Sequence, residues 1–124
     1  MKKAELIVRI LLGLLLLVFG LNKFFNFMPM PPMSESAGDF MGALVNTGYM
    51  MYFIGLVEAV SGLLLLINKF KPLALVIVFP VLLNAFLFHL FLDIGGIGAA
   101  AMATAMNVFL FFVNKDKYDS ILKV

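Results

Sequence analysis

Glu58 is the residue whose position most strongly suggests chemistry. It lies in YFIGLVEAVSGLLLLI (residues 52–67), which holds no other charged residue and belongs to a segment long enough to cross a bilayer. A carboxylate at the centre of a membrane helix costs roughly 2.5–3.5 kcal/mol on insertion scales, so such a residue usually has a partner and a function. The candidate partners are Lys23, Asn84, His89 and Asn107.

Polar residues at a similar depth predict a pocket around Glu58. A helical rise of about 1.5 Å per residue puts Glu58 roughly 15 Å from Gly48, near the middle of the membrane. We expect Glu58, Lys23 and His89 to carry any catalysis, in a pocket that opens toward the outer side. Pro80 is expected to kink the third span close to this pocket. The ligand-binding candidates are Asn84, Asn107, Thr104, Asn22 and Asp93.

Each of these residues also has a purely structural interpretation. Lys23 can form a structural ion pair with Glu58, or extend its amine to the headgroups, as we expect Arg9 to do at the opposite end of its helix. The asparagine amides can join helices by hydrogen bonds. His89 can be interfacial, and Asp93, four residues later, is expected to orient its ring and to cap the following helix.

Composition identifies an integral membrane protein. The 124 residues are 64% hydrophobic and 13% charged, whereas soluble domains average about 45–50% and 25%. The chain has no cysteine, which excludes thiol redox chemistry, disulfides, iron–sulfur clusters and thiolate metal sites. One histidine cannot give bis-histidine haem ligation, no glycine-rich nucleotide loop is present, and the net charge of +2 gives no basis for nucleic-acid binding. We expect no metal site and no covalently bound cofactor.

Methionine is concentrated in one connection. Six of the nine methionines lie between residues 28 and 51, and MPMPPM (28–33) opens this segment. Thioethers bind Cu(I), but methionine also fills irregular apolar interfaces. Because no histidine or cysteine accompanies the cluster, we favour an apolar interface over copper binding.

Four apolar segments predict an all-α membrane protein, a left-handed four-helix bundle that forms a single domain over residues 1–124. A spanning helix needs about 20 predominantly apolar residues. The expected spans are residues 4–27, 48–68, 72–92 and 94–113, followed by a tail at 114–124. Met1-Lys2-Lys3 before an apolar run also resembles a signal peptide, but no A-x-A cleavage site follows.

Basic residues predict the orientation. Eight of the nine, all except Lys23, lie at the start of the chain, between spans two and three, or in the tail, which includes Lys123. Four spans put these three segments on one side of the membrane, and lysine and arginine favour the cytoplasmic side. We expect a multi-pass protein of the bacterial inner membrane, surrounded by lipid, with both termini in the cytoplasm.

The connection between spans one and two is expected to hold a short interfacial helix over residues 34–47. The prolines before it, Pro31 among them, prevent a continuous helix, and Ser34 is a suitable N-cap. The helix is either a lid over the pocket or a plain connector. Its apolar face carries Phe40, Met41, Leu44 and Val45.

Glycines repeat every seven residues in the first two spans. Small residues let membrane helices approach closely, and a strict seven-residue period favours a left-handed supercoil. Because Gly55 and Gly62 share a helix face with Glu58, Glu58 is expected to point into the bundle. The repeating glycines are Gly13 and Gly20 in the first span and Gly48, Gly55 and Gly62 in the second.

Three stretches of the sequence resemble the DoxX family of small four-span bacterial membrane proteins. They are RILLGLLLLVFGLNKF (residues 9–24), with its G-x-N-K-F exit, FIGLVEAVSGLLLLI (53–67), with its G-x-x-E-x-x-x-G pattern, and NAFLFHLFL (84–92). The resemblance covers nearly the whole chain. It implies that Glu58, Lys23 and His89 occupy the polar positions of the family.

The resemblance also implies a link to quinone-coupled oxidation. The family includes subunits of thiosulfate:quinone oxidoreductase and members of oxidative-stress complexes, and related four-span proteins of eukaryotes act as cargo receptors or assembly factors. We therefore expect a subunit of a membrane redox system that binds a quinone or another small molecule. The alternatives are a non-enzymatic assembly or cargo partner, and a small carrier that works as a homo-oligomer. The absence of cysteine argues against a thiol mechanism like that of vitamin K reductase.

Overall fold

Four apolar helices long enough to span a membrane make up most of the computed structural model, which describes residues 2–30 and 32–122. The expected all-α four-helix bundle is therefore confirmed, while the handedness of its supercoil stays a prediction. Met1, Pro31 and Lys123, which entered the predictions above, lie outside the described residues. The spanning helices are α1 (Lys2–Phe25), α3 (Met50–Ile67), α4 (Lys71–Leu92) and α5 (Ile97–Val113), the last preceded by the 3₁₀ turn η1 (Ile94–Gly96).

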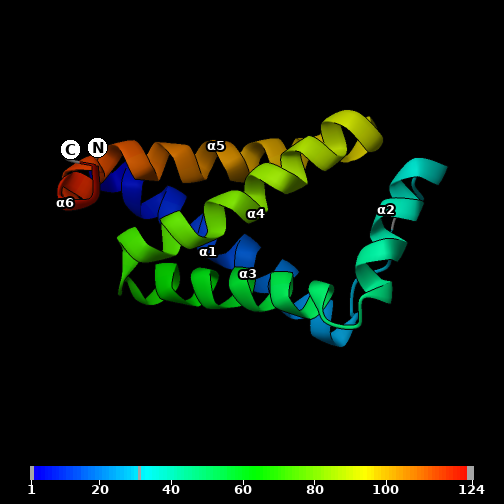
Figure 1. Cartoon of the computed structure of the whole chain (residues 1–124). Helices are drawn as coiled ribbons and strands as arrows, with labels where there is room; N and C mark the ends of the chain where they lie inside the picture. The colour runs from blue at the N-terminus through cyan, green and yellow to red at the C-terminus, as the bar shows by residue number, and fades with distance from the viewer. Residues whose placement is uncertain (1, 31, 123–124) are drawn as a thin grey trace.

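The four helices form a ring in which α1 lies beside α3, α3 beside α4, α4 beside α5, and α5 beside α1. Both chain termini lie at one end of the bundle, here called the terminal end, and the short helix α2 (Glu35–Asn46) crosses the other, the α2 end (Figure 1). Helix α4 starts next to α3 at the terminal end and finishes next to α5 at the α2 end (Figure 1). The two neighbours α3 and α4 therefore diverge toward α2.

Helices α1 and α3 touch backbone to backbone at the glycines of the seven-residue repeat. A Cβ atom added to Gly20 would lie 2.5 Å from the nitrogen of Ala59, and one added to Gly62 would lie 2.6 Å from the carbonyl oxygen of Gly13. No larger residue fits there without moving a helix. The expectation that these glycines mark a close helix contact is confirmed.

The two ends of α3 correct two expectations. Gly48 lies in the turn before the helix, with a φ of 81° and no atom near its Cβ position, so the span begins at Met50 and Gly48 is not part of the contact. At the other end, Arg9 is buried and its Nη1 donates to the carbonyls of Leu65 and Leu66. Arg9 therefore does not reach for the headgroups. It satisfies carbonyls at the C-terminal end of α3, where the helix dipole also favours a cation.

The core is formed by aliphatic side chains from all four spanning helices. Many large apolar residues also cover the outside of the bundle, as expected where lipid is the solvent. The chain is thus a multi-pass membrane protein. The core residues are Leu12, Leu16, Leu65, Ala74, Leu75, Val78, Leu82, Ala103 and Leu110.

The C-terminal segment folds back on the terminal end as η2 (Lys115–Tyr118) and α6 (Asp119–Leu122). The Tyr118 hydroxyl donates to the carbonyl of Pro72 at 2.9 Å, and its ring stacks on Phe111 at 4.6 Å. Burial raises the pKa of the Tyr118 phenol above its ordinary value. At the same end, Lys71 forms an ion pair with Glu5.

Candidate functional site

Lys23 and Glu58 form an ion pair between α1 and α3. The Lys23 Nζ atom lies 2.6 Å from Glu58 Oε1, and Glu58 is only 7% exposed. Gly55 makes this approach possible, because a Cβ atom at position 55 would lie 2.9 Å from the Cβ of Lys23. With the two backbones so close, the Lys23 side chain spans the distance to Glu58 on the next turn of α3.

The ion pair lies in the wall of a cavity of about 360 Å³ between α2, α3 and α4. We call this cavity the Glu58 pocket. It lies where α3 and α4 diverge. Its polar lining is Lys23, Glu58, Asn84 and His89, and its apolar lining is Phe40, Met41, Leu44, Met50, Met51, Phe53, Ile54, Pro80, Val81, Ala85 and Phe88.

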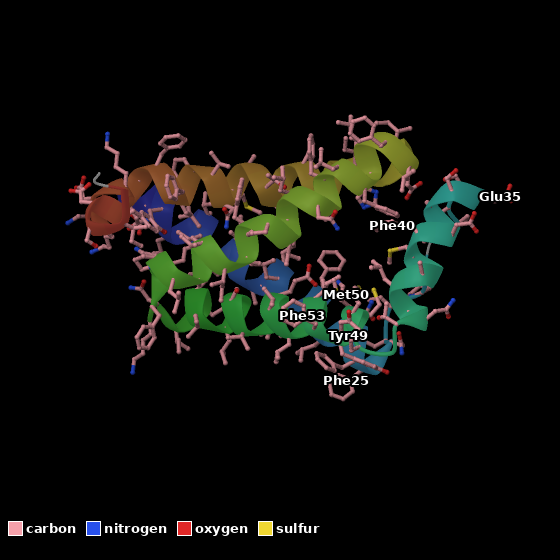
Figure 2. The ribbon with its side chains drawn as sticks, in the orientation of Figure 1. Phe25, Glu35, Phe40, Tyr49, Met50 and Phe53 are labelled. Atoms are coloured by element: carbon pink, nitrogen blue, oxygen red, sulfur yellow. The ribbon has the colours of Figure 1, made fainter. Side chains whose placement is uncertain are left out.

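Helix α2 covers one end of the Glu58 pocket with Phe40, Met41 and Leu44 of the expected apolar face, whereas Val45 is exposed. The rings of Phe40 on α2 and Phe88 on α4 lie 5.4 Å apart. Figure 2 shows Phe40 pointing from α2 toward α4, with Met50 and Phe53 on the first turns of α3 at the same end. The geometry is that of a cover, whereas a role for α2 in admitting a ligand stays a prediction.

Ser34 fixes the start of α2 in two ways. Its Oγ accepts a hydrogen bond from the nitrogen of Ala37 at 3.1 Å, so the predicted N-cap is confirmed. The same hydroxyl donates to the carbonyl oxygen of Leu92 at 2.6 Å. Leu92 is the last residue of α4, where carbonyl groups lack partners within the helix. The cover is therefore tied to the end of α4.

His89, which lines the pocket, contacts Asp93 one turn further along the chain. The His89 Nδ1 atom lies 3.1 Å from the backbone oxygen of Asp93 and 3.5 Å from its carboxylate. Both oxygens accept hydrogen bonds, so we assign a proton to Nδ1. Asp93 occupies the N-cap position of η1, but its side chain makes no capping hydrogen bond, and the N-cap of α5 is Gly96, so the expected side-chain cap of the fourth span is wrong.

The other predicted ligand-binding residues lie in different places. Asn84 lines the Glu58 pocket. Asn22 accepts a hydrogen bond from the Met28 nitrogen at 2.8 Å, and it lines an adjoining cavity of about 350 Å³ that also includes Lys23. Asn107 and Thr104 were expected near Glu58, but the structure does not bring them into its pocket.

Asn107 and Thr104 instead lie on α5, on the side where it meets α4. Thr104 donates to the carbonyl of Ala100 at 2.8 Å, and Asn107 Nδ2 lies 3.3 Å from the carbonyl of Leu75. Helix α5 neighbours α4 and α1 in the ring. Its polar residues therefore do not line the Glu58 pocket.

The aromatic lining that α3 and α4 supply to the pocket was missed in the sequence. Phe88 and Phe53 look like any other apolar residue of a membrane helix, and nothing in their type marks them. A signal did exist for Phe88, because Pro80, Asn84 and Phe88 are spaced four residues apart and so lie on one face of α4. Among the described residues, no group of three His, Asp or Glu side chains could hold a metal ion.

Comparison with known proteins gives one family match. The model of the DoxX family matches residues 4–90, which include α2, α3 and most of α1 and α4. All four polar residues of the Glu58 pocket lie within the matched residues, whereas α5 lies outside them. No curated protein and no solved structure matches the chain.

Proposed function

Because the chain belongs to the DoxX family, we propose that it is a quinone-binding subunit of a membrane redox system, with the Glu58 pocket as the binding site. The observation that carries the proposal is the Lys23–Glu58 ion pair, which lies in the wall of a cavity that is otherwise largely aromatic and aliphatic. A charged pair inside an apolar cavity offers a polar group of a ligand the strongest contacts available there.

The residues of the pocket fit a quinone in shape and in hydrogen-bonding character. A quinone ring is flat and apolar and carries two opposite carbonyl acceptors. The Lys23 ammonium and the Asn84 amide are donors for such carbonyls, and the Phe40–Phe88 pair offers aromatic surface for the ring. The cavity of about 360 Å³ falls in the range of roughly 300–1,000 Å³ of small-molecule sites.

The same residues suit proton transfer. A bound quinone would supply two-electron, two-proton redox chemistry. Reduction of the quinone by an external electron donor would need two protons, and Glu58 and the His89 Nε2 atom could each take up one proton from solvent and pass it to a quinone oxygen. The Lys23 ammonium would stabilise the Glu58 carboxylate whenever it carries no proton. The chain contains no cysteine, so a thiol of this chain is not the electron donor, and we assign that role to another protein of the system.

We propose that the terminal end faces the cytoplasm of a bacterial inner membrane. The lysines at positions 2, 3, 69, 71, 115 and 117 all belong to that end, whereas Lys23 is near the α2 end. Such an excess of basic residues favours the cytoplasmic side. The Glu58 pocket would then lie in the outer half of the membrane. Labelling of Ser36→Cys but not Ser120→Cys by an impermeant maleimide on intact cells would support this orientation, and the reverse pattern would refute it.

The binding test compares two ion-paired lysines at opposite ends of the bundle. Decylubiquinone binding is measured on purified protein in nanodiscs for Lys23→Met combined with Glu58→Met, which leaves no charge behind, and for its matched control, Lys71→Met combined with Glu5→Met. Loss of a hydrogen bond from a charged donor costs about 1.5–3 kcal/mol, so the Lys23–Glu58 double variant should weaken binding about 10- to 100-fold. The Lys71–Glu5 double variant should bind like the unaltered protein. Equal binding by all three proteins would refute the proposal.

A further inference from the structure

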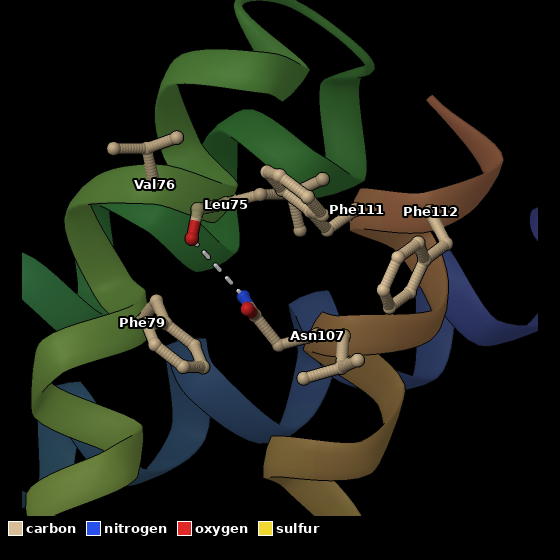
Figure 3. Close-up of a pocket in the computed structure, with 7 residues that line it drawn as sticks. Leu75, Val76, Phe79, Asn107, Phe111 and Phe112 are labelled. Carbon is tan, nitrogen blue, oxygen red and sulfur yellow. Dashed lines mark hydrogen bonds between the residues drawn. The ribbon is translucent and has the colours of Figure 1, made fainter. Parts of the chain in front are cut away.

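A second cavity lies between α4 and α5, away from the Glu58 pocket. Its volume is about 410 Å³, and it shares no lining residue with the Glu58 pocket. Its lining includes Leu75, Val76 and Phe79 of α4 and Asn107, Phe111 and Phe112 of α5 (Figure 3). We call it the Asn107 pocket, because Asn107 is the single polar residue in its lining.

Asn107 presents a hydrogen-bond acceptor to this pocket. The residue is only 2% exposed, and its Nδ2 atom donates to the carbonyl oxygen of Leu75 at 3.3 Å. Because a carbonyl only accepts, the amide nitrogen must be the atom that faces Leu75, and Oδ1 takes the other position. Figure 3 shows the amide directed at Leu75 within the pocket. Oδ1 accepts no hydrogen bond from the residues that the structure describes.

An acceptor without a donor in an apolar pocket limits what the pocket can bind. A ligand that donates to Oδ1 gains a hydrogen bond that a purely apolar ligand cannot make. The group must be a hydroxyl or an N–H, because a ketone or quinone carbonyl would only add a second acceptor. No charged side chain lines the pocket, so an ionic ligand would have no counter-charge.

A groove continues from the Asn107 pocket along the same pair of helices. An adjoining cavity of about 610 Å³ shares Phe79 and Val108 with it and is bordered on α5 by Ala101 and Ala105. Small side chains leave room there for an apolar chain. Asn107 lies six residues, about 9 Å, from the terminal end of α5, and Ala105 and Ala101 follow toward the other end of the helix. An apolar chain in this groove would therefore run along α5 from Asn107 toward the α2 end.

We propose that the Asn107 pocket binds a long-chain alcohol taken from the bilayer. The hydroxyl donates to Asn107 Oδ1, and the chain runs past Phe79 and Val108 to Ala101 and Ala105. This site is separate from the proposed quinone site. The two sites also differ in the hydrogen bonds they offer. The Asn107 pocket offers an acceptor and so favours a ligand that donates, whereas the Glu58 pocket offers donors to a ligand that accepts.

The test uses pairs of ligands that differ only in the donor. The full chain in nanodiscs is labelled with a photoreactive diazirine analogue of hexadecanol, and the labelled peptides are mapped by mass spectrometry. Unlabelled hexadecanol should protect α4 and α5 about three- to tenfold better than hexadecyl methyl ether, which accepts but cannot donate. Farnesol and its methyl ether form a second pair, which distinguishes an isoprenoid from a straight-chain alcohol.

Two variants locate the hydrogen bond. Asn107→Leu should abolish the difference between alcohol and ether, whereas Asn84→Leu, in the Glu58 pocket, should retain it. Equal protection by alcohol and ether on the unaltered chain would overturn the proposal, even if Asn107→Leu fails to fold. Labelling confined to the Glu58 pocket would overturn it as well. Neither outcome bears on decylubiquinone binding, so the two proposals stand or fall separately.

Discussion

Replacing Lys23 with methionine should destabilise the protein far more than replacing Glu58 with methionine. Both substitutions break the same 2.6 Å contact, but they leave different charges behind. Lys23→Met leaves a carboxylate inside the bundle, with a side chain only 9% exposed. Glu58→Met leaves an ammonium on the last turn of α1, with a side chain 20% exposed and a flexible stem that can turn toward the α2 end.

The magnitudes follow from what happens to the remaining charge. Removing one partner of a buried pair costs about 3–5 kcal/mol when the other charge stays buried, which is the expectation for Lys23→Met. Loss of a pair whose remaining member reaches solvent costs about 1 kcal/mol or less, which is the expectation for Glu58→Met. The double variant buries no charge and should lie within about 1 kcal/mol of the unaltered protein.

The absence of cysteine allows a clean assay of unfolding. Ala103 is 2% exposed in the core, so Ala103→Cys places a single thiol where a maleimide reaches it only after the helices separate. The rate of modification is measured against the mole fraction of dodecyl sulfate for the two single variants and the double variant in this background. The free energies of unfolding are compared at a common detergent composition.

The decisive result is the stability of the double variant. If it is as unstable as Lys23→Met, the two side chains do not depend on each other, and the ion pair does not explain why a carboxylate is tolerated in α3. If both single variants are equally unstable, the difference in exposure between the two side chains does not determine the cost. Recovery of stability in the double variant would show that charge pairing, and no other property of these residues, stabilises this part of the bundle.

Gly20→Ala should destabilise the protein by about 1–3 kcal/mol, because the added methyl group would lie 2.5 Å from the backbone of α3. Gly98→Ala, at an open position of α5, should instead stabilise it by about 0.4–1 kcal/mol, and thiol accessibility distinguishes the two. Burial raises the pKa of Tyr118 in the folded chain, so its contribution to stability is complete below the ordinary value of about 10 and is lost as the pH rises through the raised value. Unfolding measured across this range should lose that pH dependence in Tyr118→Phe, and an unchanged profile would refute the assignment.

The type and number of helices could be predicted because lipid permits few solutions. A segment of about 20 apolar residues must satisfy its backbone internally, and so it becomes a helix whatever its neighbours are. The α1–α3 contact could be predicted from glycine spacing for a similar reason. Gly48 failed this prediction because glycine also serves turns, and its φ of 81° is a turn conformation that spacing alone does not distinguish from a helix contact.

The polar site could be predicted in part because depth is read from sequence. Counting residues along each helix brought Lys23, Glu58 and Asn84 to one level, with His89 nearer the outer side, and the four residues line one cavity. Asn107 passed the same count, but it faces another cavity. The difference lies in rotation about the helix axis and in the order of helices around the ring, which depend on contacts between helices rather than on the position of a residue within one.

The prediction that Arg9 extends to the headgroups was wrong for a different reason. Its sequence neighbours indicate a cation near one end of an apolar helix, and such residues commonly extend to the headgroups. Its actual partners are carbonyls of Leu65 and Leu66, more than fifty residues away. The end of α3 supplies these acceptors only because α1 and α3 run side by side. The contact could therefore be predicted only once the pairing of these two helices was known.

The glycine contact between α1 and α3 restricts the motion of these two helices relative to each other. Where backbones touch, no side-chain rotamer can relax, so the two helices must move as one stiff body. Helix α4 bends more easily, because Pro80 has no N–H to donate to the carbonyl of Val76. Widening of the gap between α3 and α4 is therefore a swing of α4 beyond Pro80, on the microsecond-to-millisecond scale of collective motions. Helix α2 follows this swing, because the Ser34–Leu92 hydrogen bond ties it to the moving end. We therefore expect α4 to move away from α3, while α1 and α3 stay in contact.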